Sequence, residues 1–278
     1  MVRFGVVSWV WVYPFDTGFI SRAKEIGFDG VEIPVEDPRY IDVKRVREEL
    51  NSNGIECSSL CAVLSPDRDA KSVDEAVRRN AIGYIKKCID LAVELGTDIV
   101  AGPLYSSVGP TLEVPDKESE WRRSVYSVRD MAEYAEDRGV YLCVEPINRF
   151  ENHLVNTVDE ALKFIEEVDS PNVKMHFDTF HANIEEKSIR DSLMKCGETL
   201  YHFHACENDR GAPGSGHIPW REVAEALKSI GYDRYMVIET FQPGIKEIAA
   251  AAAIWRPLAP SQDSLARDGL NFLKRLMG

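Results

Sequence analysis

The sequence predicts an α/β fold, a (β/α)₈ TIM barrel that forms a single domain over residues 1–278. Eight short apolar or β-branched runs alternate with amphipathic helical patterns along the chain. Eight such units in 278 residues match this barrel, which typically takes roughly 250 residues. No linker-like composition divides the chain. An open doubly wound sheet is the competing arrangement, but residues 8–16 lack the Gly-rich phosphate turn of its dinucleotide-binding forms.

The strands are predicted where β-branched, aromatic or apolar residues cluster in short runs. In chain order they are RFGVVSW (3–9), GVEIP (30–34), IECSSLCAVL (55–64), DIVAGPL (98–104), VYLCVEP (140–146), VKMHFD (173–178), LYHFHAC (200–206) and YMVIET (235–240).

The helices are predicted where apolar residues recur at i, i+3, i+4 and i+7, and many of these patterns finish in Gly, a common helix stop. They are residues 19–27, 42–54, 74–96, 119–139, 158–168, 188–196, 220–231 and 264–278. The alanine run 249–253 predicts one further short helix.

Composition excludes several classes of protein. The net charge of −13 and a pI near 5.0, without a Lys/Arg cluster, argue against a nucleic-acid partner. Six cysteines without a CxxC pair suit a reducing compartment. No apolar run approaches the roughly 18–20 residues of a membrane span, and the N-terminus begins as a strand and not as a signal peptide. We therefore expect a cytoplasmic protein that does not bind membranes.

Acidic and histidine residues stand at the ends of four consecutive predicted strands. They are Glu145, Asp178, His204 and Glu239, at intervals of about one βα unit. The carboxyl ends of barrel strands converge on one mouth, where barrel enzymes carry out their chemistry. The four side chains are therefore expected to meet there.

Three carboxylates and one imidazole form an oxygen-rich ligand set. Such a set suits Mn²⁺, Mg²⁺ or Co²⁺ better than a thiolate-bound structural zinc. His202 and His176 lie deeper in their strands and are expected to be hydrogen-bonded core histidines. An alternative for Asp178 is that it merely caps the helix that follows in FDTFHANIEE (177–186).

Four segments together resemble the ketose 3-epimerases, the D-tagatose 3-epimerase and D-allulose (psicose) 3-epimerase group of the xylose isomerase-like barrels. They are VEPINRFENHLVNTVDEAL (144–162), HFDTFHANIEE (176–186), HFHACENDRGAPGSGHIPW (202–220) and VIETF (237–241). The similarity is clear from about residue 75 onward.

The resemblance implies one divalent metal ion per subunit, most often Mn²⁺, bound by residues that match Glu145, Asp178, His204 and Glu239. It also implies that Glu145 and Glu239 are the acid/base pair, and that Glu151, His181 and Arg210 bind the C1–C2 end of a small sugar substrate. A homodimer or homotetramer is expected by the same resemblance, and the helix-cap role of Asp178 becomes the less favoured one. Without the resemblance, we would expect Arg210 to be an exposed arginine in a loop.

The expected reaction is metal-dependent epimerisation of free ketoses at C3, of the D-tagatose/D-sorbose, D-fructose/D-allulose or L-ribulose/L-xylulose type. Proton removal beside a ketone gives a cis-enediolate, whose charge a metal ion stabilises as a Lewis acid. The chain departs from well-known relatives in GPLYSSVG (102–109), where Val108 lies near the position of a tryptophan, and in SWVWVYP (8–14). These departures leave the preferred ketose open.

Other functions remain as alternatives. An aldose–ketose or hydroxypyruvate-type isomerase would use a similar metal site. A phosphosugar enzyme would need a phosphate cradle, which GAPGSG (211–216) could supply through backbone N–H groups, although a mobile loop is favoured. An AP endonuclease would need further ligands and a basic groove. A non-catalytic sugar-binding barrel would have no use for the acid/base pair.

Overall fold

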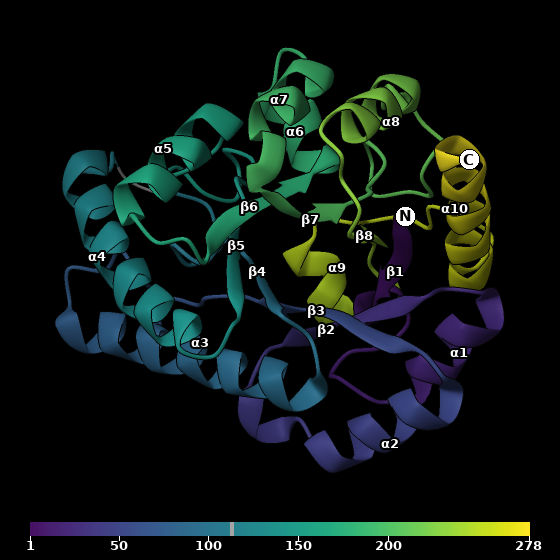
Figure 1. Ribbon diagram of the computed structural model, residues 1–278, viewed down its shortest axis with the longest axis horizontal. Coiled ribbons are helices and arrows are strands. Elements are labelled where there is room, and N and C mark those ends of the chain that lie inside the picture. The colour runs from purple at the N-terminus through teal and green to yellow at the C-terminus, as the bar shows by residue number, and fades with distance from the viewer. Residues whose placement is uncertain (112–113) are drawn as a thin grey trace.

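A computed structural model describes residues 1–111 and 114–278, and its strands form a closed barrel in the order β1 to β8 (Figure 1). All eight neighbouring pairs are parallel, and β1 closes the barrel on β8. The strands are β1 (Arg3–Val7), β2 (Gly30–Val35), β3 (Glu56–Ala62), β4 (Ile99–Gly102), β5 (Tyr141–Val144), β6 (Val173–Asp178), β7 (Leu200–His204) and β8 (Tyr235–Ile238). The predicted (β/α)₈ fold is confirmed.

Most of the helices form an outer ring around the barrel, as Figure 1 shows. The helices are α1 (Gly18–Ile26), α2 (Val43–Asn53), α3 (Glu75–Leu95), α4 (Lys117–Glu136), α5 (Val158–Val168), α6 (Thr179–Glu185), α7 (Ile189–Cys196), α8 (Trp220–Ser229), α9 (Lys246–Ala251) and α10 (Gln262–Met277). Three short 3₁₀ turns complete the list, namely η1 (Ser8–Val10), η2 (Pro38–Tyr40) and η3 (Gly197–Thr199). The sequence patterns predict all the helices except α6, which is too short to show a clear period.

Local sequence signals explain where several helices begin and end. The hydroxyl of Thr157 accepts from the backbone N–H of Glu160, and the carboxylate of Glu160 accepts from the backbone N–H of Thr157. Helix α5 therefore starts with a full capping box. Gly27 and Gly54 end α1 and α2 in the left-handed conformation that glycine adopts without strain. These caps fix the direction in which each helix returns to the barrel.

The barrel interior is almost fully buried, and strand register places the residues at its mouth. Asp178 is paired with His204 across β6 and β7, and His204 with Val237 across β7 and β8. Gly102 ends β4 with a φ of +130°, and a Cβ there would overlap the carbonyl oxygen of Ala62. The carbonyl of Gly102 accepts from the N–H of Glu145 at 3.1 Å, so the end of β4 helps to hold the backbone of Glu145 in place.

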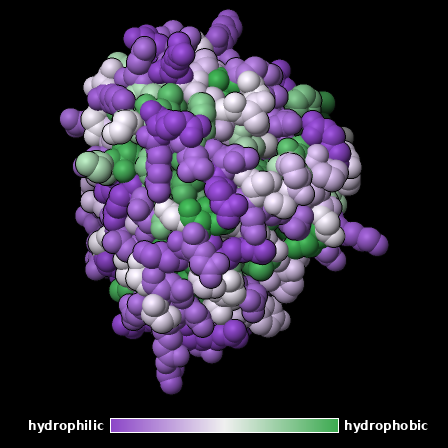
Figure 2. Space-filling view, turned by 90° about the vertical axis from the view of Figure 1, so that its right-hand side faces the viewer, coloured by the Kyte–Doolittle hydropathy of each residue, from purple (hydrophilic) through white to green (hydrophobic). Residues whose placement is uncertain are grey.

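Helix α9 lies across the barrel axis and not in the outer ring (Figure 1). On the face that Figure 2 shows, hydrophilic side chains predominate and hydrophobic ones form small groups. None of the helices within the described ranges is long and apolar enough to cross a membrane.

Candidate active site

Four side chains converge at the carboxyl end of the barrel, one from each of β5 to β8. Glu145 follows β5, Asp178 ends β6, His204 ends β7 and Glu239 follows β8. Nδ1 of His204 lies 3.5 Å from Oε2 of Glu239 and 4.0 Å from Oδ2 of Asp178. All four residues are at most 5% exposed. The structure thus brings together the four strand-end residues that the sequence singles out.

Asp178 uses its two carboxylate oxygens in different directions. Oδ1 accepts from the backbone N–H of Phe180 at 2.6 Å and so caps α6. Oδ2 faces the barrel mouth and accepts from Nη1 of Arg210 at 2.6 Å. Treating the helix cap as a disfavoured alternative was wrong, because Asp178 is a helix cap and a member of the cluster at the same time.

Arg210 is a central part of this cluster. Its Nη1 lies 2.6 Å from Oδ2 of Asp178 and 2.5 Å from Oε2 of Glu239, and the residue is 5% exposed. The interpretation as an exposed loop arginine was therefore wrong, because two carboxylates compensate the burial of its charge. The backbone of Arg210 has a φ of +66°. Its carbonyl accepts from Oγ1 of Thr240 at 2.5 Å, and this hydrogen bond fixes the backbone from which the side chain enters the site.

Glu207 anchors the loop that carries Arg210 into the site. Its carboxylate is fully buried and accepts from the backbone N–H groups of Gly214 and Ile218 at 2.8 and 2.9 Å and from Nε1 of Trp220 at 2.8 Å. The N–H of Gly211 is donated to Asp209. Within residues 211–216, the N–H groups of Gly211, Gly214 and Ser215 donate to the protein itself, which disfavours the phosphate cradle considered from the sequence.

Replacing Glu207 with alanine is expected to lower the free energy of unfolding by about 3 kcal/mol, because the buried donors of Ile218 and Trp220 lose their acceptor and Gly214 loses its own. Chemical denaturation of the wild type and the E207A variant measures this loss. E225A, which removes an exposed glutamate on α8, is the control and should leave stability close to that of the wild type. Equal stability of E207A and E225A would show that the loop does not depend on this carboxylate.

A second group of side chains lies beside the cluster, on the loop after β5 and on α6. Nδ1 of His181 accepts from the backbone N–H of Asn148 at 3.1 Å, and Nδ2 of Asn148 donates to Oε1 of Glu151 at 2.8 Å. Nε2 of His181 lies 3.8 Å from Oε1 of Glu145. The structure thus places Glu151, His181 and Arg210 around one side of the mouth, with Asn148 connecting the first two.

These residues line a cavity of about 340 Å³ at the barrel mouth. Its wall includes Glu145, Glu151, His181, Arg210, Glu239, Trp9, Tyr13, Glu36, Cys61, Val108, Phe241, Glu247 and Ile248. The last two come from α9, which covers the opening. Trp9 faces the cavity, whereas Trp11 turns away and donates from Nε1 to Asp263 at 2.8 Å. The cavity has the size and the mixed polar and aromatic lining of a small-molecule site.

Comparison with known proteins identifies the family. Residues 20–276 match the family model described as a xylose isomerase-like TIM barrel. A D-psicose 3-epimerase of Ruminiclostridium cellulolyticum is 36% identical over 90% of this chain and 86% of its own length. A probable ketose 3-epimerase of Synechocystis sp. is 32% identical over 99% of this chain and 96% of its own. The chain belongs to the ketose 3-epimerase family.

A solved structure gives the same result in three dimensions. The crystal structure of a D-allulose 3-epimerase of Methylomonas sp. in complex with D-allulose superposes with a TM-score of 0.93 at 29% identity, covering 99% of this chain and 96% of that one. The resemblance drawn from the four sequence segments is confirmed. As a member of the ketose 3-epimerase family, the protein is an isomerase, as predicted.

The buried charges of the site perturb one another. Burial raises the pKa of Glu145 well above its ordinary value, and the nearby carboxylates of Glu239 and Asp178 add to the rise. Burial also opposes the ionisation of Asp178, yet the charges of Arg210, His181 and His204 lower its pKa to about 2. For His204, burial by itself would lower the pKa, but Glu32 and Glu239 raise it well above its ordinary value.

The donor set fits the divalent cation that the family resemblance implies. Nδ1 of His204 is buried and has no hydrogen-bond partner among the described residues. It lies within ion-binding reach of Asp178 and Glu239, and Glu145 joins Asp178 in an adjoining group with His181. Three carboxylates and one imidazole nitrogen can therefore hold a hard or borderline dication in this epimerase-family site.

The sequence interpretation missed several residues of the site. Glu32 lies in the middle of β2 and is fully buried, and the signal for it is a charge inside the apolar run GVEIP. Asn148 is part of the NRFE motif, but nothing in its spacing indicates a link to His181. His202 lies in the core with Nε2 2.6 Å from Glu32, although poorly aligned for a hydrogen bond. His176 is buried too. No ring nitrogen of His176 or His202 has a hydrogen-bond partner within the described ranges, so the expectation of hydrogen-bonded core histidines was wrong for both.

Proposed function

We propose that the protein catalyses the metal-dependent epimerisation of free ketoses at C3, with residues 1–278 acting as one catalytic domain. The observation that carries the proposal is the arrangement of Glu145 and Glu239. Each belongs to a group of potential ligands that includes Asp178, so both carboxylates reach the surroundings of Asp178, one from the end of β5 and the other from the end of β8. Two carboxylates on either side of a common centre are what inversion at one carbon requires.

Epimerisation needs a proton to leave one face of C3 and another to arrive on the opposite face. One glutamate removes the C3 proton, and the electron pair left behind is shared with the C2 carbonyl as a cis-enediolate. The other glutamate, in its acid form, delivers a proton to the opposite face of C3, and the two exchange roles in the reverse direction. Burial of Glu145 favours its neutral form, which suits a carboxylate that takes up a proton.

The remaining residues of the site hold the substrate and the cation. Glu145, Asp178, His204 and Glu239 would bind the metal ion, for which we propose Mn²⁺, with Co²⁺ and Mg²⁺ as alternatives. When bound, the ion acts as a Lewis acid on negative charge that develops on the sugar oxygens. Glu151, His181 and Arg210 would hydrogen-bond the C1–C2 end of the ketose. We also propose a homodimer or homotetramer, and a cytoplasmic location that the six buried free thiols support.

Mn²⁺ binding at pH 7 is expected to release about one to two protons per chain, because the cation requires ionised Glu145 and neutral His204. Both groups have raised pKa values in the folded metal-free chain. Both therefore bind more protons in the folded than in the unfolded chain, so the stability that these two groups contribute to the metal-free protein should fall as pH rises above 4.5 for Glu145 and above 6.5 for His204, their ordinary pKa values. Calorimetry in buffers of different ionisation enthalpy measures the release. Identical heats in all buffers would contradict this prediction.

The reaction itself is tested by incubating Mn²⁺-loaded protein in D₂O with D-fructose, D-tagatose and L-ribulose separately. NMR should show the C3 epimer of at least one sugar, with deuterium at C3. Aldose formation with deuterium at C1 or C2 would replace the proposal with the aldose–ketose isomerase alternative. No exchange on any sugar, with bound metal verified, would favour a phosphorylated substrate or a binding role.

A further inference from the structure

The imidazole of His204 is held between two sets of carboxylates. Nδ1 faces the barrel mouth, 3.5 Å from Glu239 and 4.0 Å from Asp178. Nε2 faces the opposite way and lies 2.9 Å from Oε1 of Glu32. The two ring nitrogens therefore have different partners, and which of them carries hydrogen decides which can bind a cation.

Glu32 sits in a fully buried environment that keeps its carboxylate in one place. Oε2 accepts from Oγ of Ser59 at 2.6 Å and lies 2.6 Å from Nε2 of His202. Oε1 lies 2.9 Å from Nε2 of His204, so each oxygen of this carboxylate faces a side chain that can donate to it. A carboxylate among such groups acts as an acceptor, so Nε2 of His204 carries the hydrogen.

We infer that Glu32 is a positioning residue that fixes the His204 ring with Nε2–H toward β2 and the Nδ1 lone pair toward the barrel mouth. Metal-binding histidines depend on such partners for tautomer, orientation and basicity, and loss of the partner typically costs about 10- to 100-fold in metal affinity. The role for metal binding rests on the proposed function, whereas the Nε2–H contact with Glu32 is independent of it.

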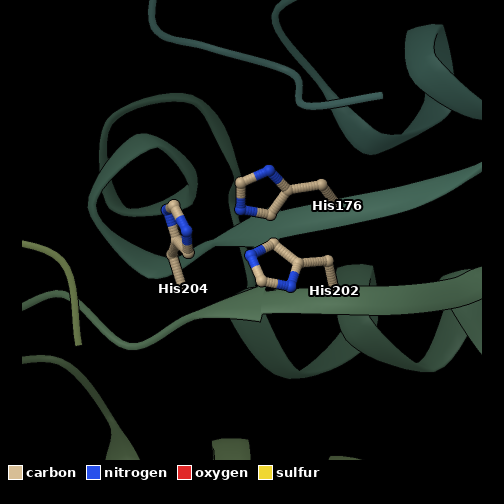
Figure 3. Close-up of side chains that lie close together, drawn as sticks. All are labelled: His176, His202 and His204. Atoms are coloured by element: carbon tan, nitrogen blue, oxygen red, sulfur yellow. The ribbon is translucent and has the colours of Figure 1, made fainter. Parts of the chain in front are cut away.

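Three neighbouring histidines offer an alternative role for Nε2 of His204. His176 from β6 and His202 and His204 from β7 group closely, with ring nitrogens turned toward one another (Figure 3). They could form a second metal centre that uses Nε2 of His204. The rings, however, are packed edge to face, with centroids 4.1 to 4.9 Å apart, and Nε2–H of His204 is already directed at Glu32. One metal ion per chain is therefore expected.

The test compares the wild type with the variants E32L and E32Q and with the control E225Q, which changes an exposed glutamate on α8. Calorimetry should show E32L binding Mn²⁺ about 10- to 100-fold more weakly than the wild type. E32Q, whose amide oxygen can still accept from Nε2–H, should lose less affinity, and E225Q should match the wild type. In ¹H–¹⁵N NMR of metal-free or Mg²⁺-loaded protein, a slowly exchanging His204 Nε2–H resonance should be present in the wild type and E225Q and absent in E32L.

Wild-type affinity in E32L, or an unchanged Nε2–H resonance, would overturn the inference, and so would two Mn²⁺ ions per wild-type chain. If E32L does not fold, Mn²⁺ affinity is measured in E32D, whose shorter side chain draws the carboxylate away from His204. Unchanged Mn²⁺ affinity in E32D would then overturn the inference. If the wild type epimerises no ketose while the affinity and NMR results hold, the proposed function fails and the inference stands.

Discussion

Replacing Glu239 or Glu145 with glutamine is expected to lower kcat for C3 epimerisation by about 10²- to 10⁴-fold. Glutamine keeps the size of the side chain but can neither remove a proton from C3 nor return one. Each variant should nevertheless exchange the C3 hydrogen with D₂O in the epimer whose hydrogen faces the remaining glutamate. Loss of inversion together with one-sided exchange would assign each glutamate to one face of the sugar.

E222Q makes the same chemical change on the exposed surface of α8 and should turn over like the wild type. Thermal unfolding of all three variants separates lost chemistry from lost fold. A folded, Mn²⁺-loaded E239Q or E145Q with kcat near that of the wild type would remove the acid/base pair from the mechanism.

Replacing Arg210 with alanine is expected to lower the free energy of unfolding of the metal-free protein by about 3–5 kcal/mol, because it leaves Asp178 and Glu239 buried without their cation. Saturating Mn²⁺ should recover much of this loss, since the ion supplies positive charge to the same carboxylates. The loaded variant should still have a higher KM, because Arg210 is proposed to bind the C1–C2 end of the ketose. Denaturation with and without Mn²⁺, together with steady-state kinetics, measures both effects.

Arg256 provides the matched control, since it pairs with Asp209 at 3.1 Å with its own side chain 65% exposed. R256A should cost less than about 1 kcal/mol, as exposed ion pairs usually do. Equal destabilisation of R210A with and without Mn²⁺ would mean that the ion and the arginine do not share these carboxylates.

The barrel and the strand-end residues were predictable because both rest on short-range patterns. Strand and helix periodicity gave the eight units, and the spacing from Glu145 to Glu239 placed four polar side chains at one end of the barrel. Helix α6 was not predicted, because seven residues are too few to show a helical period. The helix begins directly at the strand-end residue Asp178, where the sequence shows a possible cap but not whether it is used.

The supporting contacts were not predictable, because they join residues far apart in the chain. Glu32 and His204 are separated by 172 residues, and only barrel closure brings β2 and β7 to face each other across the interior. The burial of Arg210 depends on the anchoring of its loop by Glu207 and on two carboxylates from other strands. The sequence around Arg210 is polar and glycine-rich, which predicts an exposed side chain. Tertiary contacts nevertheless bury it.

The double use of Asp178 limits how this barrel can be redesigned. A designer who wants a softer metal would exchange Asp178 for histidine or cysteine, but the exchange would also remove the Oδ1 acceptor from Phe180 at the start of α6. Because α6 carries His181, the loss would spread from the metal to the sugar-binding side of the pocket. Altered metal preference at this position therefore has to be accompanied by a new start for α6, and β6 and α6 are best transplanted together.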